Sequence, residues 1–101
     1  MLHTVNKSPF ERNAFDGCLQ VAKEGHSVLL FEDGVYAGLK GTDKEEAVKK
    51  ALAANVKMYV LTSDLEARGM RTEQLIDGIE SVDYSGFVDL AVNNNPVQAW
   101  L

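Results

Sequence analysis

The chain has 101 residues, 46% of them hydrophobic and 25% charged, with a net charge of −5 at pH 7. These values fit one small globular domain spanning residues 1–101. The negative charge argues against a general nucleic-acid binder and against docking on anionic lipid, because both need a basic face. No apolar run of about 18 residues is present and the first ten residues lack a signal-peptide pattern, so we expect no membrane span and a cytoplasmic location. In that reducing compartment the single cysteine, Cys18, is expected to remain a free thiol.

Apolar runs and helical patterns alternate along the chain. The first half predicts a strand, a helix, a second strand, a loop with a helical turn, and a helix, over residues 2–5, 9–24, 28–31, 32–41 and 43–54. The second half predicts a strand, a short helix, a weak strand, a helix and a last strand, over residues 56–61, 64–69, 79–82, 84–92 and 97–101. The second and third strands are apolar throughout or nearly so, which is typical of strands buried on both faces. The alternation therefore favours an α/β fold with a mostly parallel sheet of about five strands and helices on both faces.

Three of the predicted helix starts have the Ser/Thr-x-x-Glu spacing of a capping box, with the hydroxyl residue at Ser8, Thr42 and Ser63. In this motif the hydroxyl accepts a hydrogen bond from a backbone N–H of the first turn, and the glutamate accepts one from the N–H of the capping residue. The boxes at Ser8 and Ser63 follow strands, which is the order of βα units in a parallel sheet.

Ligands and catalytic groups of parallel sheets gather at the carboxyl ends of the strands. Those ends read NKS, EDG and TSD here, at residues 6–8, 32–34 and 62–64. No glycine-rich phosphate loop is among them, so nucleotide binding has little support. We interpret Lys7, Asp33 and Asp64 as solvated loop residues and helix caps, and the alternative is a small polar rim beside a partner or a pocket.

The histidines and aromatic residues indicate less about function. The two histidines are far apart in sequence and have no cysteine or carboxylate at ligand spacing, so we expect no metal site and no cofactor. His3 is expected to point into a packed layer, and His26 to lie exposed in a turn. Trp100, on the last strand, either covers the edge of the sheet or packs into another subunit. Tyr84 and Phe87 of the last predicted helix are expected in the core.

Cys18 lies near the middle of the apolar side of the predicted helix 9–24. One interpretation is a small core residue whose thiol has a raised pKa and low reactivity. The other is a reactive thiol, which requires this side of the helix to meet a partner or a cleft and requires a cation such as Lys7 to lower the thiol pKa. Gly17 beside it leaves room for close approach. At ~100° per residue, the apolar side also holds Phe10, Ala14, Phe15, Leu19, Val21 and Ala22.

Five segments together resemble the DsrH/TusB family: MLHTVNKSPF at the start, LLFEDGVYAGL after the second strand, YVLTSDLEARG at the third strand, VDYSGFVDL in the last helix and VQAWL at the end. They span essentially the whole chain and come in the family's order. The resemblance implies a DsrE-like three-layer fold and a cytoplasmic heterohexamer with DsrE-like and DsrF-like, or TusD-like and TusC-like, subunits. Such a complex relays persulfide sulfur between cysteines and passes it to a small acceptor of the DsrC/TusE type.

The resemblance also suggests a branch of the family. DsrH-type chains carry a cysteine on the first helix, where Cys18 lies, and the segment VNKSPFERN also resembles that branch. We therefore predict a DsrH-like subunit of a relay that acts in sulfur oxidation, with Cys18 as an accessory sulfur carrier. One alternative is a TusB-like subunit with a purely structural role in the relay for 2-thiouridine synthesis on transfer RNA. The other is an independent small-ligand binding module, against which the missing phosphate loop counts.

The chain departs from the relay pattern at one important place. The principal sulfur-carrying cysteine of such complexes belongs to the DsrE/TusD subunit, near the turn after its third strand. The corresponding segment here, VLTSDLEARG, keeps an arginine–glycine pair at Arg68 and Gly69 but has no cysteine. The resemblance thus implies a subunit of a sulfurtransferase complex that lacks the principal catalytic cysteine.

Overall fold

The computed structural model describes residues 1–101 and holds five strands in one sheet. The strand order is β4-β3-β2-β1-β5, and every neighbouring pair is parallel. The predicted parallel α/β sheet of about five strands is therefore confirmed. The strands are β1 Leu2–Val5, β2 Ser27–Leu30, β3 Lys57–Leu61, β4 Glu80–Val82 and β5 Val97–Trp100.

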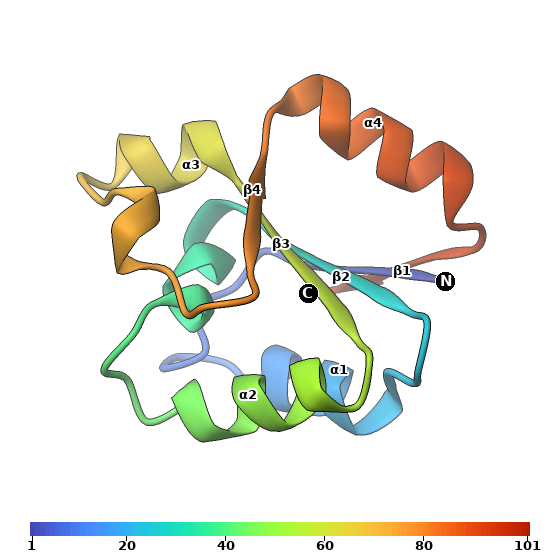
Figure 1. Cartoon of the computed structure of the whole chain (residues 1–101), viewed down its shortest axis with the longest axis horizontal. Helices are drawn as coiled ribbons and strands as arrows, with labels where there is room; N and C mark the ends of the chain where they lie inside the picture. The colour runs from blue at the N-terminus through green and yellow to red at the C-terminus, as the bar shows by residue number, and fades with distance from the viewer.

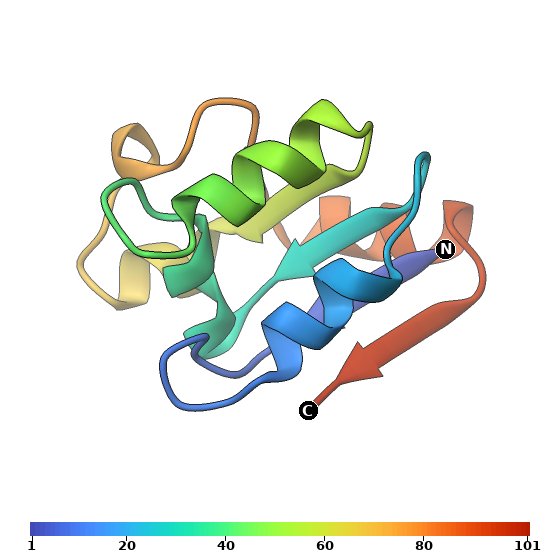
Figure 2. The same ribbon diagram turned by 90° about the horizontal axis from the view of Figure 1, so that it is seen from below.

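Helical segments connect these strands and cover both faces of the sheet. They are α1 Ala14–Val21, η1 Glu32–Gly38, α2 Glu45–Ala53, α3 Thr62–Ala67, η2 Thr72–Gln74 and α4 Tyr84–Asn93, where η marks a 3-10 helix. Figure 1 shows α1 and α2 on one face and α4 over the other, with α3 and η1 at the carboxyl ends of the strands. In Figure 2, the view from below, α1 and α2 lie in front of the sheet. The three layers expected from the sequence are present.

The main apolar core lies between the sheet and the helices. β1 and β2 are buried along their whole length, because they are internal strands with helices over both faces. Val5 of β1, Leu30 of β2 and Val60 of β3 belong to one buried cluster with Phe15 of α1 and Val48 of α2. Removing this apolar surface from water is the dominant favourable contribution to folding.

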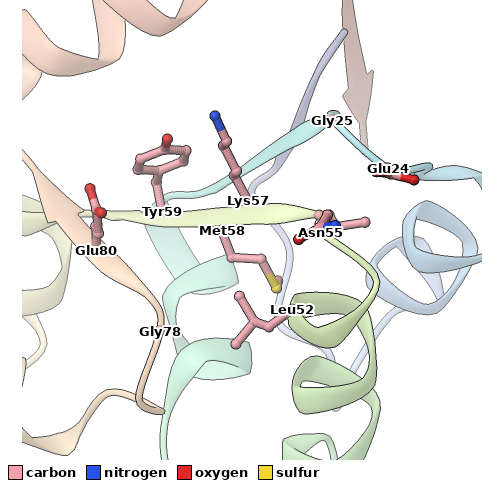
Figure 3. A pocket seen from close by; sticks show the side chains of 10 residues that line it. Glu24, Gly25, Leu52, Asn55, Lys57, Met58, Tyr59, Gly78 and Glu80 are labelled. Atoms are coloured by element: carbon pink, nitrogen blue, oxygen red, sulfur yellow. The ribbon is translucent and has the colours of Figure 1, made fainter.

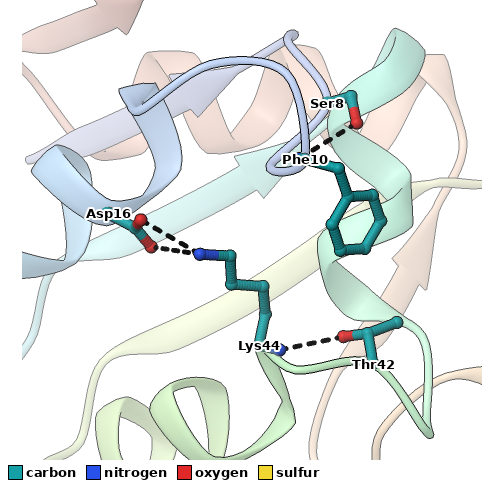
Figure 4. Close-up of polar contacts among 5 residues, drawn as sticks. All are labelled: Ser8, Phe10, Asp16, Thr42 and Lys44. Carbon is teal, nitrogen blue, oxygen red and sulfur yellow. Dashed lines mark hydrogen bonds and ion pairs between the residues drawn. The ribbon is translucent and has the colours of Figure 1, made fainter.

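The first helix is shorter than the sequence predicts. It begins at Ala14 instead of residue 9, and it ends at Val21. The hydroxyl of Ser8 accepts a hydrogen bond from the Phe10 N–H at 3.2 Å (Figure 4), and residues 9–11 form turns. A serine that bonds its own local backbone in this way competes with helix formation. Phe10 is consequently exposed and not part of the buried side of the helix.

The hydrogen bonds predicted for the capping boxes at Thr42 and Ser63 do not form either. The Thr42 hydroxyl accepts a hydrogen bond from the Lys44 N–H at 3.1 Å, two residues further on (Figure 4). The Glu45 carboxylate accepts one from the Gly41 N–H at 2.6 Å, so α2 begins without a side-chain cap. Ser63 already lies inside α3. Local turn bonds and the end of β3, which runs directly into α3, replace the expected caps.

A side-chain cap does occur at α4. The carboxylate of Asp83 accepts a hydrogen bond from the Gly86 N–H at 2.7 Å. An aspartate at this position satisfies a free N–H group and places negative charge at the positive end of the helix dipole. Because no glutamate follows Asp83 three residues later, the Ser/Thr-x-x-Glu pattern does not predict this cap.

Candidate functional site

Cys18 lies in the middle of α1 and is fully buried. It belongs to the same apolar cluster as Phe15 of α1 and Val5 of β1. Burial raises the pKa of the Cys18 thiol to about 12, because the thiolate would lose its hydration. A sulfur carrier reacts as a thiolate and needs access to its partner. In the fold of the single chain, Cys18 is neither ionised to a thiolate nor accessible to a partner.

No basic side chain lowers the pKa of this thiol. Burial is the cause of the shift, and Lys7 is exposed. Lys44 approaches α1 but pairs with Asp16, its Nζ lying 3.1 Å and 3.0 Å from the two carboxylate oxygens (Figure 4). Lys44 therefore ties the start of α2 to α1 and does not activate Cys18.

The carboxyl ends of β1, β2 and β3 are joined by hydrogen bonds among the residues at and directly after these ends. The Phe31 N–H donates to the Val5 carbonyl at 3.1 Å. The Glu32 N–H donates to Asp64 Oδ2 at 2.7 Å. Asp64 thereby holds Glu32 at a φ of 48°, in the left-handed region that residues other than glycine rarely adopt. Gly34 is required here, because a Cβ atom would lie 2.2 Å from the Val5 carbonyl oxygen.

Arg68, at the end of α3, joins α3 to the start of η1. Its Nε and Nη2 lie 3.0 Å and 2.9 Å from Asp33 Oδ1, and its Nη1 donates to the Asp64 carbonyl at 3.0 Å. The structure therefore brings Asp33 and Asp64 together and leaves Lys7 apart and exposed. Because the charge of Arg68 is compensated by Asp33, we interpret the cluster as a structural clamp. The sequence indicated Arg68 only through the family resemblance.

Three ring side chains that are far apart in sequence also come together. His3 is buried, as predicted, and its Nε2 lies 3.1 Å from Nδ1 of His26. His26 is only partly exposed, so the prediction of an exposed turn residue is wrong. Trp100 donates its indole N–H to Nδ1 of His3 at 3.1 Å and packs against Gly17 within the same chain. No group of three or more His, Cys, Asp or Glu side chains gathers to hold a metal ion.

An open hollow of about 550 Å³ lies beside β3 and β4. Lys57, Tyr59 and Glu80 point to one side of the strands, and Met58 points to the other side with Leu52 below it (Figure 3). Burial and the nearby Glu80 carboxylate raise the pKa of Tyr59. Neither a thiol nor an imidazole lines this hollow, so it offers no nucleophile for sulfur transfer.

α4 presents a stripe of exposed apolar side chains. Tyr84, Val88 and Val92 are spaced by four residues, and the first and last are 68% and 65% exposed. The prediction that Tyr84 lies in the core is therefore wrong, whereas Phe87 is partly buried and stacks on Phe31 with ring centroids 6.3 Å apart. An uncovered apolar stripe is typical of a surface that contacts another protein. None of the helices combines the length and the apolar character needed to cross a membrane.

Comparison with solved structures establishes the class of fold. The structure is similar to that of the ychN protein from E. coli, with a TM-score of 0.82 and 20% sequence identity over 97% of each chain. It is also similar to protein MTH1491 from Methanobacterium thermoautotrophicum, with a TM-score of 0.77 and 14% identity over 97% of this chain and 96% of that chain. The chain is thus a small three-layer α/β protein of the fold shared by these structures.

Sequence comparison then establishes the family. A family model described as "DsrH like protein" matches residues 7–97. Proteins named "Protein TusB" from Pectobacterium parmentieri and Shigella flexneri are 41% and 38% identical over 100 residues, which is 99% of this chain and 100% of each relative. The chain belongs to the DsrH-like family, and the resemblance seen in its five sequence segments is confirmed.

These relatives also bear on the branch of the family. Their shared name, TusB, supports the TusB-like alternative better than the predicted sulfur-oxidation subunit.

Proposed function

We propose that this chain, as one domain, is a TusB-like subunit of a cytoplasmic sulfur relay that serves 2-thiouridine synthesis on transfer RNA. The observation that carries the proposal is the similarity to proteins named TusB over essentially the full length of both chains. The partners we propose are TusD-like and TusC-like subunits and a TusE-like sulfur acceptor.

In this proposal the chain shapes the complex, and its partners supply the principal thiols. Sulfur transfer occurs when a thiolate attacks the outer sulfur of a persulfide and the inner sulfur leaves as a thiolate. α3 begins directly after β3 with Thr62, Ser63 and Asp64 and offers no thiol there, and Cys18 is buried with a raised pKa. The attacking and leaving thiolates of the main relay are therefore expected on other subunits.

The apolar stripe on α4 supports a role that depends on partner subunits. No residue of α4 is buried, although the helix carries Tyr84, Val88 and Val92 on one side. Exposed apolar area of this kind favours association, because contact with a partner removes it from water.

The accessory-carrier role of Cys18 stays a prediction. It requires that the partners or a local opening of α1 expose the thiol and lower its pKa. In the rival interpretation, which the burial supports, Cys18 is inert and fills space in the core.

Complementation in a bacterium whose own gene for the TusB protein has been deleted tests the proposed function. We expect deletion to abolish 2-thiouridine in transfer RNA, measured by mass spectrometry of nucleosides, and the wild-type chain to restore it. Cys18→Ala also restores it if the role of Cys18 is structural, and fails to restore it if Cys18 carries sulfur. Unchanged 2-thiouridine together with lost oxidation of reduced sulfur compounds would replace this proposal with the DsrH-like alternative.

Co-purification tests the dependence on partners. A tagged chain co-expressed with TusC-like and TusD-like subunits is expected to retain both. Val88→Asp on the α4 stripe is expected to weaken that retention, whereas Asp89→Ala, at the exposed neighbouring position, is the matched control. A tagged wild-type chain that retains neither subunit contradicts the proposal.

A further inference from the structure

A chain of hydrogen bonds joins the N-terminal strand, the turn before β2 and the C-terminal strand. Trp100 Nε1 lies 3.1 Å from His3 Nδ1, and His3 Nε2 lies 3.1 Å from His26 Nδ1. The Lys23 N–H also donates to His26 Nδ1, at 3.2 Å. His3, at the centre, is fully buried in β1.

The positions of the protons follow from the indole, which can only donate. Because Trp100 donates to Nδ1 of His3, that nitrogen must carry a lone pair, so neutral His3 has its proton on Nε2. This Nε2–H then donates to Nδ1 of His26, which the Lys23 N–H also requires as an acceptor. His3 is therefore neutral in this arrangement, and the indole N–H, the His3 Nε2–H and the Lys23 N–H each have an acceptor.

One added proton breaks this arrangement at the indole. An imidazolium has N–H groups at both nitrogens, so a protonated His3 would direct an N–H at the N–H of Trp100. Protonation of His3 thus replaces the donor–acceptor pair at Trp100 with two donors.

The surroundings of His3 contain no carboxylate that would favour its charged form. Burial is the main cause that lowers the pKa of His3, followed by His26 from the turn before β2 and by the terminal amine of Met1, which precedes β1. Its partners across the sheet are Val28 of β2 and Gln98 of β5, neither of which titrates. α1, which packs against β1 and β5, contributes the buried Cys18, whose raised pKa keeps it uncharged.

Trp100 is the side chain that anchors β5 to the body of the protein. The other three residues of this edge strand, Val97, Gln98 and Ala99, are exposed, and only Trp100 is partly buried. Its ring lies against α1, where a Cβ on Gly17 would approach Cζ3 to 3.2 Å. Loss of the bond to His3 therefore weakens the one side-chain attachment of the strand.

We propose that His3 and Trp100 form a pH-sensitive latch, in which protonation of the buried imidazole releases the indole and frees β5 from the edge of β1. The latch is closed at neutral pH and opens in mildly acidic conditions. Opening exposes the edge of β1, whose unpaired backbone can accept another strand. The inference depends on this chain alone and not on the function proposed above.

The single tryptophan makes the latch directly observable. As the pH falls from about 8 to about 5, we expect Trp100 emission to shift to longer wavelength in one transition below the ordinary histidine pKa. The protection factors of the β5 amides, which correct for the slower intrinsic exchange at lower pH, are expected to fall over the same range, while those of β2 and β3 stay high. An unchanged emission spectrum, or protection in β5 that is lost only together with that of β2, overturns the proposal.

Two glutamine variants separate His3 from His26. In His3→Gln the side-chain carbonyl can accept the indole N–H at every pH, so the emission transition is expected to disappear. In His26→Gln the transition is expected to persist and move to higher pH, because His3 still titrates without its neighbouring imidazole. A transition that persists in His3→Gln overturns the latch. If His3→Gln does not fold, nitrogen-15 NMR of the wild-type His3 ring decides, since a neutral ring protonated on Nδ1 also overturns it.

Discussion

Gly17 of α1 faces the indole of Trp100 so closely that a Cβ atom on Gly17 would lie 3.2 Å from Cζ3 of the ring. The missing side chain is what lets the last strand dock on the first helix. The same ring donates a hydrogen bond to His3, so it cannot move away from a larger residue without losing that bond.

Gly17→Val is accordingly expected to lower the free energy of unfolding by about 1–3 kcal/mol, because its branched side chain overlaps a ring that is held in place. Urea unfolding followed by circular dichroism measures the loss, and Trp100 emission reports the displaced ring. Valine is a better helix former than glycine, so helix propensity alone would stabilise Gly17→Val, whereas it would destabilise Gln20→Val at an exposed position of the same helix. A Gly17→Val variant that loses no stability would show that the ring contact is unimportant.

The Cys18 thiol is expected to resist alkylation in the folded chain. Burial raises its pKa from 9.0 to about 12, so the reactive thiolate is about a thousandfold scarcer than in the unfolded chain. Iodoacetamide labelling at neutral pH, with and without urea, measures the ratio of rates. Native labelling within about tenfold of the unfolded rate contradicts a protonated, buried thiol. Faster labelling in the assembled complex than in the single chain would support the accessory-carrier prediction.

The same thiol is expected to make the fold sensitive to alkali. Its folded-state pKa is raised, so its contribution to stability is complete below about pH 9 and is lost as the pH rises towards about 12. Over this window the unfolded chain releases a proton that the folded chain keeps, which costs up to about 1.4 kcal/mol per pH unit. The free energy of unfolding should therefore fall more steeply with pH in the wild type than in Cys18→Ala. Parallel curves for the two proteins would rule out the buried thiol as the cause.

The Lys44–Asp16 pair is expected to stabilise the packing of α2 on α1. The side chains are 19% and 45% exposed, so water screens the pair only in part. We expect a coupling of about 0.5–1 kcal/mol from a double-mutant cycle of Lys44→Met and Asp16→Asn, and a smaller coupling in high salt. Lys49→Met removes the partner of Glu45 within α2. Because the Lys49 side chain is more exposed than that of Lys44, we expect this substitution to lower the free energy of unfolding less than Lys44→Met does. A coupling near zero in low salt contradicts the bridging role of Lys44.

Arg68→Lys is expected to loosen the contact between η1 and α3. Lysine cannot bond Asp33 and the Asp64 carbonyl together in the geometry of the guanidinium, so we expect a loss of about 1–3 kcal/mol and faster amide exchange over residues 32–34. Arg71→Lys, at a position where the side chain is 81% exposed, is the matched control and should change little. Equal effects of the two substitutions would argue against the clamp.

The strands could be predicted from the sequence to within one residue at each end, because the signals that mark them, above all the continuous apolar run of β2, are local. The first helix could not, because Ser8 bonds the neighbouring Phe10 N–H and the chain turns before it becomes helical. Helical spacing placed Cys18 correctly on the buried side. It also placed Tyr84 in the core, where the structure exposes it, because spacing finds the apolar side of a helix and not what covers that side.

The order of elements, the parallel sheet and the family could all be read from the chain alone, since they depend on local periodicity or on segments compared in order. The missing cysteine after the third strand could be read in the same way. Only the tertiary structure decided that Trp100 docks on its own chain, that the two histidines touch, and that Arg68 joins Asp33 to Asp64. These contacts join residues that are distant in sequence, and their energies depend on distance, burial and proton position, which residue spacing does not contain.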